Sequence, residues 1–160
     1  PAPHAHPADR SMIVPGVRER RSIDRQLTDF FRTYGPQQFR SAIASISRFY
    51  RLRSPRVEWF EYLDWGKSGG RTFEDGKVAL VHPENWKRGR KYNSERHWIQ
   101  TVYHEMGHYV LWADAERKAD LFAYRFVHGV AANGTYRHAM RPQTATQSRL
   151  HRRPRRARSR

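Results

Sequence analysis

The chain has 160 residues, of which 38% are hydrophobic and 13% aromatic, enough for one domain with a single core. It carries 31 lysines and arginines against 15 acidic residues, a net charge of +16, which predicts polyanionic surroundings such as nucleic acid. Because the chain contains no cysteine, disulfide bonds and thiolate metal ligands are excluded.

Two further classes of protein are not expected from the hydrophobic pattern. No segment approaches eighteen consecutive apolar residues, so we expect no membrane-spanning helix and no membrane partner. The first thirty residues contain no apolar stretch typical of a secretory signal. We therefore expect an intracellular, cytoplasmic protein.

The N-terminal part of the chain predicts an arm followed by two helices. Residues 1–21 are rich in proline and alanine, without hydrophobic periodicity, and form the predicted flexible arm. Helical periodicity begins after Ser22, a good N-cap, and ends at Gly35-Pro36; a second helix is predicted over residues 37–51. The apolar positions that share one face along these two helices are Ile23, Leu27, Phe30, Phe31, Tyr34, Phe39, Ile43, Ile46 and Tyr50.

The middle of the chain predicts a β-hairpin. Residues 57–65 (VEWFEYLDW) and 77–82 (KVALVH) are rich in β-branched and aromatic side chains, as strands are. The GKSGG loop follows the first run, and the turn-forming sequence Glu74-Asp75-Gly76 precedes the second. We therefore expect these two runs to pair as antiparallel strands.

Two more helices and a basic tail complete the predicted organisation. Asn93 or Ser94 can cap a helix that continues to about Trp112, and Asp114 can cap a last helix that ends near His128. This order predicts an α+β domain over residues 22–130. No acidic residue follows position 120, and residues 131–160 form an Arg-rich tail. The tail arginines that we expect to contact DNA or RNA include Arg152, Arg153, Arg155 and Arg156.

The motif HEMGH, residues 104–108, lies on the first of these two helices. Residues four apart on a helix share a face, so His104 and His108 present two imidazoles to one point, as a tetrahedral zinc ion requires. Glu105 is rotated by about 100° from His104, beside the metal. There it can take a proton from a zinc-bound water and pass it to a leaving amine, the division of roles that H-E-x-x-H encodes. Gly107 would let a neighbouring element approach closely.

The sequence HEMGHYVLW followed by ERKADLFA resembles the ImmA/IrrE-type metallopeptidases, a branch of the gluzincins. Their pattern is HELGH and then E-x-x-A-(N/D)-x-F-A on the next helix. The resemblance is close over residues 103 to about 126 and loose over the preceding elements. It implies a small gluzincin-like domain in which strand 77–82 is the edge strand that receives an extended substrate.

The resemblance also assigns roles by position. It implies that His104 and His108 are zinc ligands and that Glu105 is the catalytic base. Glu116 matches the glutamate ligand, and Asp120 matches a residue that orients a ligating histidine by hydrogen bonding. Gluzincins also need a donor for the oxyanion, for which the candidates are Tyr103, Tyr124 and Arg125.

The third ligand is left open by the spacing. Only seven residues separate His108 from Glu116, and on one unbroken helix the two would lie about 12 Å apart along the axis. The chain must therefore reverse between residues 112 and 115. After so tight a turn Asp120 could lie nearer to the histidines than Glu116, so it stays an alternative ligand, and His128 is a more distant one.

Two functions follow from these patterns. The first is a zinc-dependent endopeptidase that hydrolyses a protein substrate near nucleic acid. Because the proteins it resembles often cleave DNA-bound regulators of mobile elements, a phage or mobile-element origin is expected. The alternative is a basic nucleic-acid-binding or virion structural protein that retains a metallopeptidase-like fold, which the +16 charge and the tail favour.

Overall fold

The computed structural model describes residues 13–63, 68–89, 94–112 and 115–129. The predicted tail and its four named arginines, like most of the predicted arm, lie outside these ranges. The mixture of helices and a small sheet confirms the predicted α+β class. The described elements are α2 (Val17–Thr33), α3 (Pro36–Phe49), β1 (Val57–Phe60), β2 (Gly70–Thr72), β3 (Val78–Val81), α4 (Pro83–Trp86), α5 (Glu95–Leu111) and α6 (Glu116–His128).

The first helix begins earlier than its hydrophobic pattern predicts. Helix α2 starts at Val17, so residues 17–21 belong to it and not to the arm. The added turn is held by Arg20, whose guanidinium donates to the backbone oxygens of Pro15 (2.9 Å) and Phe126 (3.0 Å). This anchoring to the end of α6 is a tertiary contact, which local periodicity does not reveal. Helix α3 has Pro36 in its first turn, where proline is favoured, and ends two residues before the predicted boundary.

The sheet differs from the predicted hairpin. Its strand order is β1-β3-β2, with β1 parallel to β3 and β2 antiparallel to β3. The antiparallel pairing of 57–65 with 77–82 is therefore wrong. The antiparallel partner of β3 begins at Gly70, the last residue of the predicted GKSGG loop, and pairs there with Leu80. A short strand with the sequence GRT has no alternation of apolar and polar residues that could mark it.

The central place of β3 also corrects its predicted role. The strand is hydrogen-bonded to β1 on one side and to β2 on the other, and all four of its residues are buried. It has no free backbone edge, so the expectation that 77–82 is a substrate-binding edge strand is wrong. The strand that lies at an edge and contacts α5 is β2.

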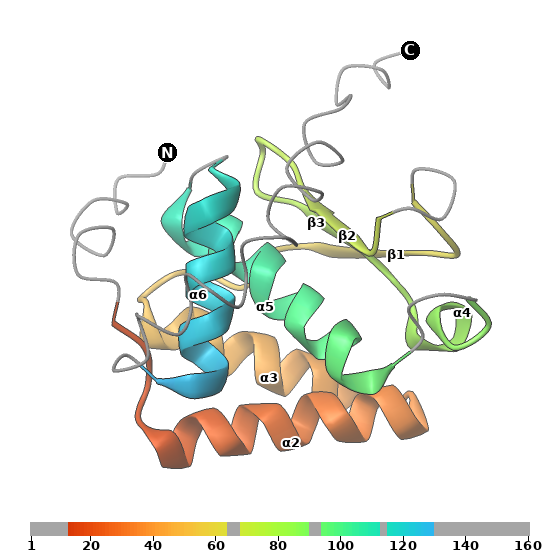
Figure 1. Ribbon diagram of the computed structural model, residues 1–160, viewed down its shortest axis with the longest axis horizontal. Helices are drawn as coiled ribbons and strands as arrows, with labels where there is room; N and C mark the ends of the chain where they lie inside the picture. The colour runs from red at the N-terminus through yellow and green to blue at the C-terminus, as the bar shows by residue number, and fades with distance from the viewer. Residues whose placement is uncertain (1–12, 64–67, 90–93, 113–114, 130–160) are drawn as a thin grey trace.

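Helix α5 runs through the middle of the molecule, between the sheet and the α2–α3 pair (Figure 1). Its anchor is Trp98, which is fully buried and contacts the rings of Phe30, Phe31 and Phe39. The indole N–H donates to the carbonyl of Val81 at 3.0 Å, so the polar atom of this ring is satisfied inside the core. Ser94 caps the helix as predicted, by accepting from the backbone N–H of His97.

The reversal between α5 and α6 is confirmed. Helix α5 ends at Leu111, and Trp112 adopts a left-handed conformation (φ 53°, ψ 46°) that turns the chain back. Helix α6 begins at Glu116, with Ala115 at the cap position predicted for residue 114. The two helices pack closely because Gly107 has no side chain. A Cβ added there would lie 3.0 Å from the Cβ of Phe122.

None of the described helices is both long enough and apolar enough to cross a membrane.

Candidate metal centre

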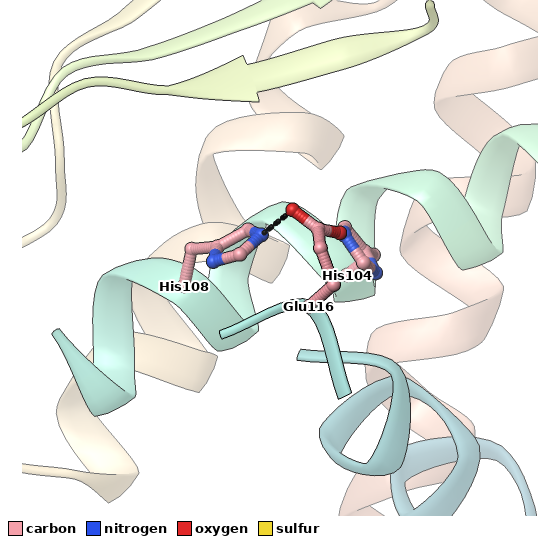
Figure 2. A group of neighbouring side chains, drawn as sticks. All are labelled: His104, His108 and Glu116. Carbon is pink, nitrogen blue, oxygen red and sulfur yellow. Dashed lines mark hydrogen bonds and ion pairs between the residues drawn. The ribbon is translucent and has the colours of Figure 1, made fainter. Parts of the chain in front are cut away.

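Helices α5 and α6 bring two imidazoles and one carboxylate together. His104 and His108 lie one turn apart on α5, and Glu116 is the first residue of α6. The Nε2 atom of His104 is 3.0 Å from Oε1 of Glu116, and Nε2 of His108 is 3.3 Å from Oε2. Figure 2 shows the carboxylate placed between the two rings. All three residues are buried, and one ligand atom from each lies within 4.8 Å of the others, close enough to hold one metal ion.

Asp120 lies on the other side of the His104 ring. Its Oδ1 is 2.8 Å from Nδ1 of His104, while Nε2 of the same ring faces Glu116. The carboxylate of Asp120 is 2% exposed and one helical turn beyond Glu116 on α6. A carboxylate in this position holds the Nδ1 proton and leaves the Nε2 lone pair directed to the centre. Of the two carboxylates, the one that contacts both histidines is therefore Glu116.

His128, the more distant alternative, is not part of the centre. It follows Glu116 by twelve residues on α6, about 18 Å along the helix axis. Its ring is exposed and stacks on Tyr124, with ring centroids 4.3 Å apart. This exposed histidine offers a matched comparison for the buried histidines of the centre.

The centre concentrates ionisable groups away from water. Burial alone would lower the pKa of His104, but hydrogen bonds from its ring to Asp120 and Glu116 and the charge of Glu105 raise that pKa to about 9. The carboxylates of Glu105, Glu116 and Asp120 all lie buried beside the two imidazoles. Buried carboxylates are costly unless a positive charge compensates them, and either a protonated histidine or a metal cation can do so.

Glu105 is held on the sheet side of α5. Its side chain is completely buried, and its Oε1 accepts a hydrogen bond from the hydroxyl of Thr72 at 2.7 Å. The backbone of β2 comes equally near, since a Cβ on Gly70 would lie 2.7 Å from Cγ of Glu105. Strand β2 thus fixes the carboxylate with one hydroxyl and one glycine. Neither residue was identified from the sequence, where a Gly-Gly pair before a polar run was interpreted as a loop, although glycine in a strand can also mark close backbone approach.

The other candidates from the sequence lie away from the centre or have structural contacts. The hydroxyl of Tyr103 donates to Asp24 of α2 at 2.8 Å, and its ring packs on Phe126, so it faces the helix pair. Tyr124 and Arg125 follow Glu116 by eight and nine residues on α6, about 12 Å or more along the axis. No oxyanion donor is identified among these residues.

No protein-family model matches this chain, and neither a curated protein nor a solved structure is significantly similar to it. The ImmA/IrrE-type assignment therefore stays a prediction based on the motif. The geometry of the centre stands independently of that assignment.

Proposed function

We propose that this protein is a zinc-dependent endopeptidase of the minimal gluzincin type, in which Glu105 is the catalytic base. The observation that carries the proposal is the buried group of His104, His108 and Glu116, with Glu105 on the same helix. Two histidines and one carboxylate leave a fourth coordination position open, as catalytic zinc sites require. The proposed substrate is a peptide bond of a protein.

The chemistry of the donor atoms supports zinc as the metal. Two imidazole nitrogens and one carboxylate, with one ligand atom of each within 4.8 Å of the others, are the kind of ligands that zinc takes. Imidazole nitrogen is a poor ligand for magnesium and calcium, which select oxygen. When bound, a zinc ion would act as a Lewis acid and lower the pKa of water in contact with it.

The residues of the chain orient the ligands and transfer the proton. His104 is oriented by Asp120, which fixes which ring nitrogen faces the centre. Glu105 accepts the proton of the attacking water and transfers it to the nitrogen of the leaving amine, so one carboxylate serves both steps. Burial of Glu105 excludes competing water, and the Thr72 hydroxyl limits its orientation. Proton transfer requires that the Glu105 side chain be held in one orientation, and its contact with β2 does this.

Metal exchange tests the proposal directly. Protein dialysed against a chelator such as 1,10-phenanthroline should not cleave a quenched fluorogenic peptide library. Addition of Zn²⁺ should restore cleavage, whereas Mg²⁺ should not. Zinc at a thousand times its Kd should also stabilise the fold by about 4 kcal/mol, measured as a rise in Tm. Cleavage that survives complete metal removal, confirmed by elemental analysis, would reject the proposal.

Thr72 is expected to act as a positioning residue for Glu105. Thr72→Val keeps the shape of the side chain but removes a hydrogen bond to a carboxylate, a contribution of about 1.5–3 kcal/mol, so kcat should fall about tenfold or more. Thr72→Ser keeps the hydroxyl and should retain most of the rate, and zinc content should be unchanged in both variants. An equal loss in the serine and valine variants would assign Thr72 to packing instead.

A second function remains compatible with the first. The net charge of +16 exceeds what peptide hydrolysis needs and favours binding of DNA or RNA. The Arg-rich tail over residues 131–160 is the proposed contact outside the described residues. A protein with both properties would act on substrates that are themselves bound to nucleic acid.

A further inference from the structure

We propose that a pocket at the C-terminal end of α5 binds one nucleotide of a single-stranded nucleic acid. The pocket has a volume of about 450 Å³, within the range of small-ligand sites. Three segments form it: residues 52–56 after α3, the turn between β2 and β3, and the last turn of α5. The residues that carry the inference are Arg53, Arg56, Tyr109 and Trp112.

The pocket presents an aromatic face to solvent. Trp112 is 40% exposed, although tryptophan is among the residues most often used for buried contacts. It occupies the left-handed position at the end of α5, where glycine is usual and a large side chain is strained. Tyr34 has the same left-handed backbone at the end of α2, so the exposure of the Trp112 ring at the pocket is the observation that points to a use for it.

The ring is also held in place. The centroid of Tyr109 is 6.3 Å from that of Trp112, and both rings lie at van der Waals distance from where a Cβ on Gly76 would stand. The hydroxyl of Tyr109 donates to the backbone carbonyl of Arg53 at 2.6 Å, which ties the helix to the segment after α3. The aromatic face is thus built before a ligand arrives, so little ordering is needed on binding.

Two guanidinium groups beside this face have no counter-charge among the described residues. Arg53 and Arg56 are exposed and form no ion pair there, in contrast to Arg32, which is paired with Glu95 at 2.7 Å. Lys77 in the same pocket is paired with Glu58 at 3.3 Å. The acidic residue of the pocket, Asp75, accepts from the backbone N–H of Lys77 and shapes the turn.

This combination selects the ligand class. Guanidinium groups bind phosphate with directed pairs of hydrogen bonds, and an exposed indole stacks on the face of a base. The base faces of a duplex are covered by their neighbours, so only a single strand offers them together with its phosphates. The net charge of +16 raises the local concentration of any such polyanion. A nucleotide within a single strand therefore fits both the ring and the charges.

The pocket adjoins the metal centre without sharing its ligands. Tyr109 follows Glu105 by four residues on α5, about 6 Å along the helix axis. A bound strand would then lie one helical turn from the proposed catalytic base. The inference concerns binding alone and does not require that the protein hydrolyse peptides.

The test measures binding of a fluorescein-labelled twelve-nucleotide oligo(dT) to the full-length protein by anisotropy. Trp112→Gly removes the ring but leaves the residue best suited to the left-handed backbone, so the fold should be kept. Its affinity for the single strand should fall about tenfold, with little change for a duplex of equal length. Trp112→Phe should retain most of the affinity. A Trp112→Gly variant within twofold of the parent protein overturns the proposal, as does an equal loss for duplex and single strand.

A charge comparison completes the experiment. In an Arg53→Ala/Arg56→Ala variant, loss of two phosphate contacts should reduce the slope of log K against log salt by about 1.4. The matched control is Arg21→Ala/Arg25→Ala, which removes two exposed arginines one turn apart on α2. An equal change of slope in both variants would assign the effect to net charge and overturn the proposed nucleotide site in the pocket. Displacement of the oligonucleotide by micromolar thymidine monophosphate would overturn the single-strand ligand in favour of a free nucleotide.

Discussion

Substitution of His104 by alanine is expected to reduce the metal content of the purified protein from about one zinc per chain to almost none. His104 is the proposed ligand that both carboxylates contact, with Glu116 on one ring nitrogen and Asp120 on the other. Its removal takes away one donor and also the group that separates the two carboxylates. The remaining pair, His108 and Glu116, is an incomplete set for a tetrahedral site. Elemental analysis of protein dialysed against trace zinc measures the loss.

The same substitution should destabilise the fold. Glu116 and Asp120 are 7% and 2% exposed, and without the histidine and the metal they are buried charges with less compensation. Removing one partner of a buried charged pair costs about 3–5 kcal/mol. For a domain of this size such a cost corresponds to a decrease in Tm of roughly 10 °C or more, measurable by calorimetry.

The matched control for His104→Ala is His128→Ala. This residue is the exposed histidine at the end of α6, so the control removes the same side chain from the neighbouring helix. Its zinc content should equal that of the parent protein, and Tm should change by only a few degrees. Unchanged zinc in His104→Ala, or an equal loss in both variants, would contradict the proposed centre.

Local geometry explains which parts of the centre could be predicted. The spacing of His104 and His108 fixes their common face on any α-helix, so the five-residue motif alone brings the two imidazoles together. The reversal before Glu116 was also predictable, since a continuous helix would carry this carboxylate out of reach. The choice between Glu116 and Asp120 was left open by the spacing, and Glu116 was favoured by the resemblance alone, because the choice depends on how closely α6 packs on α5. That distance is set by the contact of Gly107 with Phe122; close approach was expected at Gly107, but Phe122 was not identified as its partner.

The contacts of Glu105 with the sheet could not be predicted from local sequence patterns. Thr72 and Gly70 are more than thirty residues before Glu105, on a strand of three residues without hydrophobic alternation. The same reason led to the wrong strand pairing. The β-prone runs 57–65 and 77–82 were correctly identified as containing strands, but their parallel order depends on β2 pairing with β3 from the other side. A single sequence reveals which segments are apolar enough for a strand more readily than which edges meet.

Substitution of Glu105 by glutamine is expected to abolish peptide hydrolysis while zinc remains bound. Glutamine has nearly the same shape, so it fits the space against Gly70. Its amide oxygen can still accept the hydrogen bond that the Thr72 hydroxyl donates. What it cannot do is take up a proton at neutral pH, so general base and general acid catalysis by this side chain are both lost. We expect kcat to fall by about 10²- to 10⁴-fold, with zinc content and Tm close to those of the parent protein.

Glu95→Gln on the same helix controls for the chemical change alone. Glu95 lies in the first turn of α5, and its ion pair with Arg32 is partly exposed, so the loss should cost less than about 1 kcal/mol and leave the rate unchanged. Two outcomes for Glu105→Gln separate the alternatives. If the rate falls and zinc stays, Glu105 is the base. If zinc is lost as well, the buried carboxylate supports the centre structurally, and the proton must be taken by another group.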